Sequence, residues 1–125
     1  MATANFGPRA YLANAAISAF RAVVLSNNGG VGLAGDAQVP DGFAQIDAAS
    51  GDYASVRHFF DGGTQRGVIT ASPITVGDTV YAGASGRVST TGTITIGKSL
   101  TTTGGAANAQ NGSVIEFIPR TTVIA

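Results

Sequence analysis

The chain has 125 residues, of which 18 are glycine and 21 are alanine, and only 11% are charged. Ordinary soluble domains carry roughly 25% charged residues. Seven basic residues balance seven acidic ones, so the chain lacks the basic stripe that holds phosphate backbones, and we expect no nucleic-acid partner. With no cysteine and one histidine, the sequence excludes disulfides, thiolate metal sites and His-paired metal centres.

The first 16 residues differ from the rest of the chain. They hold small residues, Pro8 and two isolated aromatics, Phe6 and Tyr11. Because Gly7-Pro8 breaks any regular start and no good helix cap precedes Tyr11, we expect an extended N-terminal arm. Apolar residues also recur at helical spacing from Tyr11 to Phe20, which leaves a short amphipathic helix as an alternative.

From residue 17 onward the pattern predicts short strands separated by tight turns. Eleven Val and nine Ile against four Leu favour strands, because β-branched side chains suit a pleated surface. Alternating or β-branched runs between Gly, Asn and Asp turn signals are found at 20–25, 42–46, 53–59, 67–70, 78–81, 86–89, 93–96 and 114–118. We therefore predict an all-β chain, a small β-barrel or β-sandwich, with residues 1–16 as the arm and residues 17–125 as one β-rich domain.

An internal repeat runs through this domain. Ile17, Val23, Gly29 and Val31 recur at a constant offset of 57 residues, at the positions Ile74, Val80, Gly86 and Val88. Each copy continues to a Gly-led strand, a loop and a closing strand. We expect residues 17–60 and 74–118 to form two similar β units packed together, since neither can bury a core alone.

The chain offers no catalytic constellation. The sequence contains no Gly-x-Ser-x-Gly nucleophile elbow with which His58 could act. Most carboxylates stand beside glycines, where an Asp side chain accepts hydrogen bonds from turn N–H groups. Lys98 and Glu116, the only Lys and the only Glu, are expected to form a solvated surface pair. We predict no enzyme activity, no cofactor and no metal site.

The most apolar stretch, residues 15–25, is too short to cross a bilayer and contains Arg21. The first residues also lack the basic and apolar regions of a secretory signal. We therefore expect no membrane partner and synthesis in a cytoplasm.

The second half of the chain contains three motifs, residues 74–88 (ITVGDTVYAGASGRV), Ile96-Gly-Lys-Ser-Leu100 and Gly112-Ser-Val-Ile-Glu-Phe117. In these motifs it resembles the small bacteriophage capsid decoration (cement) proteins. Ser99 stands where that family usually has Ala, and the loop before Gly112 is longer. The resemblance implies a compact β-rich domain, often a homotrimer, made in a host cytoplasm and bound to the outside of a phage head. It carries over no catalytic residues.

Together with the low charge, this resemblance predicts a structural virion protein that stabilises the capsid lattice through contacts with the major capsid protein. We expect the arm to make those contacts, or contacts between copies, through Phe6, Pro8, Arg9, Tyr11 and Leu12. Removal of residues 1–12 should then leave the fold intact. A carbohydrate- or receptor-binding module on a head or fibre is one alternative, and a tail-tube-type self-assembling subunit is another.

Overall fold

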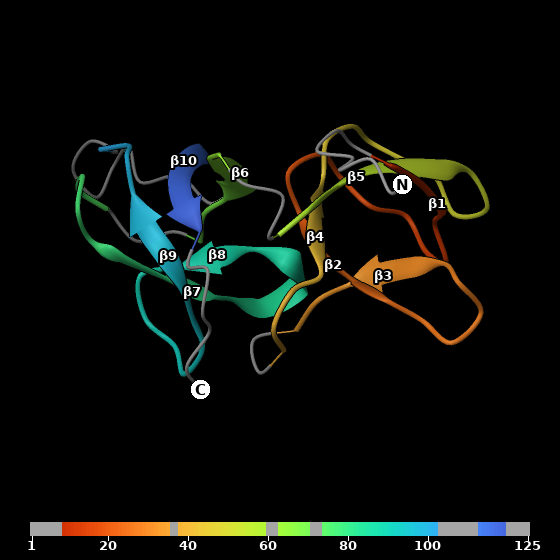
Figure 1. Ribbon diagram of the computed structural model, residues 1–125, viewed down its shortest axis with the longest axis horizontal. Helices are drawn as coiled ribbons and strands as arrows, with labels where there is room; N and C mark the ends of the chain where they lie inside the picture. Colours follow the sequence, from red (N-terminus) through yellow and green to blue (C-terminus); the bar gives the residue numbers. More distant parts are fainter. Residues whose placement is uncertain (1–8, 36–37, 60–62, 71–73, 103–112, 120–125) are drawn as a thin grey trace, which may run out of the picture.

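The computed structural model describes residues 9–35, 38–59, 63–70, 74–102 and 113–119, and within them every regular element except one 3₁₀ turn is a strand. The strands fall into two antiparallel sheets, which lie side by side along the long axis of the molecule (Figure 1). The first sheet contains β1 (Arg9–Leu12), β2 (Ala22–Leu25), β3 (Val31–Leu33), β4 (Gly42–Ala44) and β5 (Tyr53–His58). The second contains β6 (Gln65–Val68), β7 (Thr79–Ala82), β8 (Val88–Ser89), β9 (Thr95–Ser99) and β10 (Val114–Pro119), with the 3₁₀ turn η1 (Ala84–Gly86) between β7 and β8.

The two sheets have the same topology. The first has the order β1-β5-β4-β2-β3 and the second the order β6-β10-β9-β7-β8, so each strand of one sheet corresponds to the strand five places later. Each sheet is also joined at its two edges by a parallel bridge, Ala13 to Val31 in the first and Ile69 to Val88 in the second. Each half of the chain is therefore a small barrel-like unit whose outer strands meet.

The 57-residue offset of the sequence repeat also separates equivalent strands of the two sheets. β2 and β7 start 57 residues apart, as do β3 and β8, and the turns between them contain Gly29 with φ +83° and Gly86 with φ +75°. Both glycines adopt the left-handed conformation that glycine enters without steric strain. The expectations of an all-β fold and of two similar units are confirmed.

The boundary expected between residues 16 and 17 does not correspond to a break in the structure. Arg9 to Leu12 form β1, which pairs antiparallel with β5, and Ala13 and Ile17 are buried. Residues 9–16 thus belong to the first unit and contain no helix, while residues 1–8 lie outside the described part. The arm pattern was ambiguous because β1 is a sheet-edge strand with three exposed residues and one half-buried one, so it shows no alternation.

Each unit has its own interior. The interior of the first unit is small and rich in alanine, and contains the buried residues Ala13, Ile17, Val23, Val31, Ala44, Ala48, Ala54 and Val56. The interior of the second unit is larger and includes Ile74, Val80, Val88, Ile115 and Phe117.

The outer face of the first sheet packs against the interior of the second unit. Ala22, Ala34, Phe43 and Phe59 from the first unit belong to the same apolar cluster as the second unit's interior. The Phe43 ring stands edge-to-face on the Phe117 ring, with 5.5 Å between their centroids. Because β4 is covered on both sides, all three of its residues are buried.

Backbone hydrogen bonds reinforce this seam between the units. Gly86 N donates to Ala34 O at 2.7 Å, and Val68 N donates to Phe20 O at 3.1 Å. Figure 1 shows the β7–β8 hairpin, which contains η1, extending toward the first sheet. The seam is thus both apolar and hydrogen-bonded, which makes the two units one structural body.

Candidate functional site

Several carboxylates of the described residues accept hydrogen bonds from backbone N–H groups. Asp41 Oδ2 accepts a hydrogen bond from Leu25 N, Asp47 Oδ1 from Ala19 N, and Asp78 Oδ2 from Thr75 N, at 2.7 to 2.9 Å. Asp78 thus has the turn role expected from the sequence, whereas Asp41 and Asp47 accept from residues 16 and 28 positions away and link separate segments of the first unit. Within the described ranges no group of three or more His, Asp or Glu residues is placed to hold a metal ion. Those same ranges contain no helix long and apolar enough to cross a membrane.

His58 lies at the end of β5, where its Nε2 atom is 2.7 Å from the Tyr11 hydroxyl. The two rings are stacked with their centroids 5.7 Å apart. The partner of this histidine is thus a tyrosine side chain from β1. Tyr11 therefore helps to hold β1 against β5.

The residues predicted to make capsid contacts are divided between the described and undescribed parts of the chain. Phe6 and Pro8 lie outside the described residues, and Arg9, Tyr11 and Leu12 lie in β1. Leu12 is 39% exposed and stands directly opposite Tyr53, which is 69% exposed. This cross-strand pair presents an apolar surface on the first unit, and Tyr53 was not among the residues singled out from the sequence.

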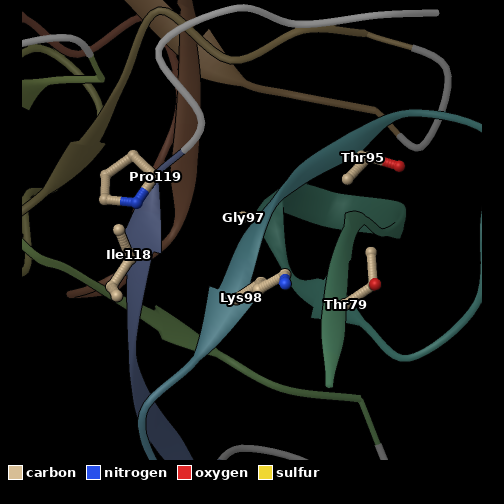
Figure 2. Close-up of a pocket in the computed structure, with 6 residues that line it drawn as sticks. All are labelled: Thr79, Thr95, Gly97, Lys98, Ile118 and Pro119. Carbon is tan, nitrogen blue, oxygen red and sulfur yellow. The ribbon is translucent and has the colours of Figure 1, made fainter. Parts of the chain in front are cut away.

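A second candidate surface is a groove on the outer face of the second sheet. It is lined by Thr79, Thr95, Gly97, Lys98, Ile118 and Pro119, with a cavity volume of about 400 Å³. Thr79, Lys98 and Ile118 are register partners on the neighbouring strands β7, β9 and β10. Figure 2 shows these side chains in a row, with Pro119 above Ile118.

Because the two units are repeats, the residues that line this groove have counterparts at matching register positions of the first sheet. Register places Ala22 opposite Phe43, and Phe43 opposite Arg57, which matches the row of Thr79, Lys98 and Ile118 in the second sheet. The first-unit row lies at the seam, where Ala22 and Phe43 are buried. The second-unit row is not covered by another unit, and Ile118 is 51% exposed.

Lys98 and Glu116 do not form the expected pair. Lys98 is exposed in the groove, whereas the Glu116 carboxylate accepts a hydrogen bond from the Thr64 hydroxyl. The Glu116 carbonyl oxygen also accepts a hydrogen bond from Leu100 N, and Glu116 N donates one to the Thr101 hydroxyl oxygen. The hydrogen bonds of Glu116 therefore hold segments of the second unit together, and the Lys98 side chain is exposed on the surface of that unit.

Comparison with solved structures yields a strong structural likeness. No protein-family model matches the sequence, and no curated protein does. The base of the head fiber protein gp8.5 of bacteriophage phi29, however, has a similar structure with a TM-score of 0.70. The likeness covers 94% of this chain and 97% of that chain at 20% sequence identity. The chain therefore shares its whole fold with a phage head fiber base, while no family match accompanies the resemblance to the decoration proteins.

Proposed function

We propose that the protein is a structural component of a phage virion that binds the outer surface of the head. In this role it contacts the major capsid protein, reinforces the capsid lattice and acts as a homotrimer without catalytic activity. The observation that carries the proposal is the likeness to a head fiber base over nearly the full length of both chains.

The surface chemistry supports the same role. The described residues expose large apolar side chains on both units, among them Leu12, Tyr53, Val76, Leu100 and Ile118. With 11% charged residues and no net charge, electrostatic repulsion between neighbouring copies is weak. Such a surface suits a subunit that adds many modest contacts to a protein lattice.

The direct test is co-sedimentation of the purified protein with phage heads that lack it. We expect saturable binding and a higher temperature of head disruption when the protein is bound, because a ligand that binds only the intact lattice stabilises it. Heads that bind the protein without any gain in stability would support attachment and contradict the stabilising role. No binding would contradict the proposal as a whole.

The contribution of the N-terminal residues is tested with a shorter truncation than the sequence first indicated. Removal of residues 1–12 would delete β1 and its pairing with β5, so the clean variant lacks residues 1–8. We expect this variant to retain the thermal stability of the full chain and to bind heads more weakly. Unchanged head affinity would show that Phe6 and Pro8 make no capsid contact.

Equilibrium sedimentation of the isolated protein tests the trimer, and monomers or long polymers would contradict it.

A carbohydrate- or receptor-binding role is the second candidate, and Tyr53 is the observation that favours it. Its ring is 69% exposed, and an exposed aromatic face is a common platform for sugar rings. A glycan array probed with the full chain and with Tyr53→Ala tests this role. Hits lost in the variant would support it, whereas no hits beside firm head binding would favour the first proposal.

A further inference from the structure

The groove on the outer face of the second sheet combines an unpaired cation with an apolar wall. Register sets Lys98 on β9 between Thr79 on β7 and Ile118 on β10, and Figure 2 shows the three side chains in that order. Lys98 is exposed, and its ammonium group has no partner among the described residues. Ile118, which is 51% exposed, and Pro119 form the apolar wall of this cavity of about 400 Å³. The groove therefore has room for side chains of another molecule.

The acidic residues that flank the groove do not neutralise this charge. The Glu116 carboxylate on β10 accepts a hydrogen bond from the Thr64 hydroxyl. Asp78, which directly precedes β7, accepts a hydrogen bond of 2.9 Å from Thr75 N. Both carboxylates are therefore engaged in holding the second unit together, and Lys98 is open to an anionic partner from elsewhere.

A patch on the first unit has the complementary character. Leu12, 39% exposed, stands opposite Tyr53, which at 69% is more exposed than any other large apolar side chain described. The exposed residue Asp52 directly precedes Tyr53. Among the described carboxylates, that of Asp52 is the one that accepts no hydrogen bond from another described residue. The Tyr53 patch, made of Leu12, Asp52 and Tyr53, thus combines an unpaired anion with an apolar surface.

The repeat provides a precedent for packing on this row of the sheet. In the first sheet the matching register positions hold Ala22 and Phe43, which are buried against the second unit. In the second sheet Lys98 stands in the place of Phe43 and is exposed. Because burying an unpaired ammonium group is costly, whatever packs on the second row must bring a negative charge.

We propose that the groove accepts the Tyr53 patch of a second copy of this chain. The Asp52 carboxylate of the second copy pairs with the Lys98 ammonium group. The Tyr53 ring and the Leu12 side chain of that copy cover the apolar wall of the groove. The patch and the groove are different surfaces, so the contact is heterologous and repeats from copy to copy until a ring closes. That the ring has three members rests on the proposed function, whereas the contact itself does not.

Charge reversal tests the contact on the isolated chain by sedimentation equilibrium. Lys98→Asp and Asp52→Lys should each raise the dissociation constant of the oligomer about tenfold, because two like charges replace an ion pair. The double variant should return to within about threefold of the wild type, since the pair is restored with its signs exchanged. Arg66→Gln, which removes an exposed cation on β6 outside the groove, should associate as the wild type does. A double variant as weak as the single ones would overturn the contact, as would a wild type that stays monomeric.

The apolar half of the contact is tested at Tyr53. Tyr53→Ala should weaken association, whereas Tyr53→Phe should preserve it because the ring remains. Lys98, Asp52 and Tyr53 are all exposed, so every variant should keep the thermal melting midpoint of the wild type. If Tyr53→Ala associated as strongly as the wild type, the ring would lie outside the contact and the proposal would fail.

Co-sedimentation with phage heads separates this contact from the proposed function. An oligomer that is insensitive to every charge and ring variant would refute the contact, while head binding by the wild type would still support the function. A wild type that failed to bind heads would contradict the function, while the charge-reversal series would still decide the contact. If Lys98→Asp left the oligomer unchanged but weakened head binding, the groove would take a segment of the head, and a second copy would not be its occupant.

Discussion

The seam between the units depends on Phe43, and its removal gives the sharpest test of the fold. Its side chain is completely buried and contacts two other rings, Phe59 at a centroid distance of 6.4 Å and Phe117 at 5.5 Å. Replacing a buried phenylalanine by alanine typically destabilises a protein by about 3–5 kcal/mol, through lost transfer energy and the cavity left behind. The edge-to-face contact accounts for about 0.5–1.5 kcal/mol beyond burial.

We therefore expect Phe43→Ala to lower the free energy of unfolding by about 4 kcal/mol, a large share of the roughly 5–15 kcal/mol that small domains possess. Urea denaturation followed by circular dichroism measures this change as a shift of the midpoint. The matched control is Ile46→Ala, two residues beyond β4, where the side chain is 54% exposed and the expected loss is below about 1 kcal/mol.

A loss below about 1.5 kcal/mol for Phe43→Ala would refute the view that this ring joins the two units. The shape of the transition gives a second check. Because the apolar cluster is continuous across the seam, the wild type should unfold in one cooperative step. Two separate transitions in the wild type would contradict the shared core.

Three further substitutions test the same structure. Gly97→Ala should destabilise the chain strongly, because a Cβ atom would lie 2.9 Å from Phe117 Cδ2 and even closer to the Ile118 carbonyl oxygen. In the control Gly32→Ala the new Cβ meets nothing within 4 Å, so thermal melting should show little loss of stability for this variant. Asp47→Ala removes the acceptor of Ala19 N and should lower the free energy of unfolding by about 1 kcal/mol, with Asp47→Asn recovering most of the loss in the same urea assay. Tyr11→Phe deletes the hydroxyl bonded to His58 and should likewise lose about 1 kcal/mol; an unchanged midpoint would mean that β1 does not depend on this contact.

The strand pattern and the repeat were readable from the sequence because they arise from local chemistry. Val23 and Val80 are fully buried on equivalent strands, and Gly29 and Gly86 occupy equivalent left-handed turn positions. β-branched residues between glycine turns predict such strands directly. The constant offset then predicts that they recur in the same arrangement.

The features that the sequence did not reveal all depend on long-range pairing. β1 is recognisable only through β5, whose register pairs Arg9 with Val56. The groove requires β7, β9 and β10 to lie side by side, although β7 and β10 are far apart along the chain. The hydrogen bond from Arg21 to the carbonyl oxygen of Ser85, 64 residues away, forms only because the two units meet at the seam. The spacing of residues within one segment does not predict contacts between residues so far apart along the chain.

The outer faces of the two sheets differ in polarity at matching positions. The first sheet presents Ala22 and Phe43 to its neighbour and buries them, while the matching positions of the second sheet hold Thr79 and Lys98. Burying an unpaired ammonium group is costly, so this row of the second sheet is poorly suited to an apolar seam like the one that Ala22 and Phe43 form. The groove around Lys98 is therefore a surface for contacts different in kind from those of the apolar seam.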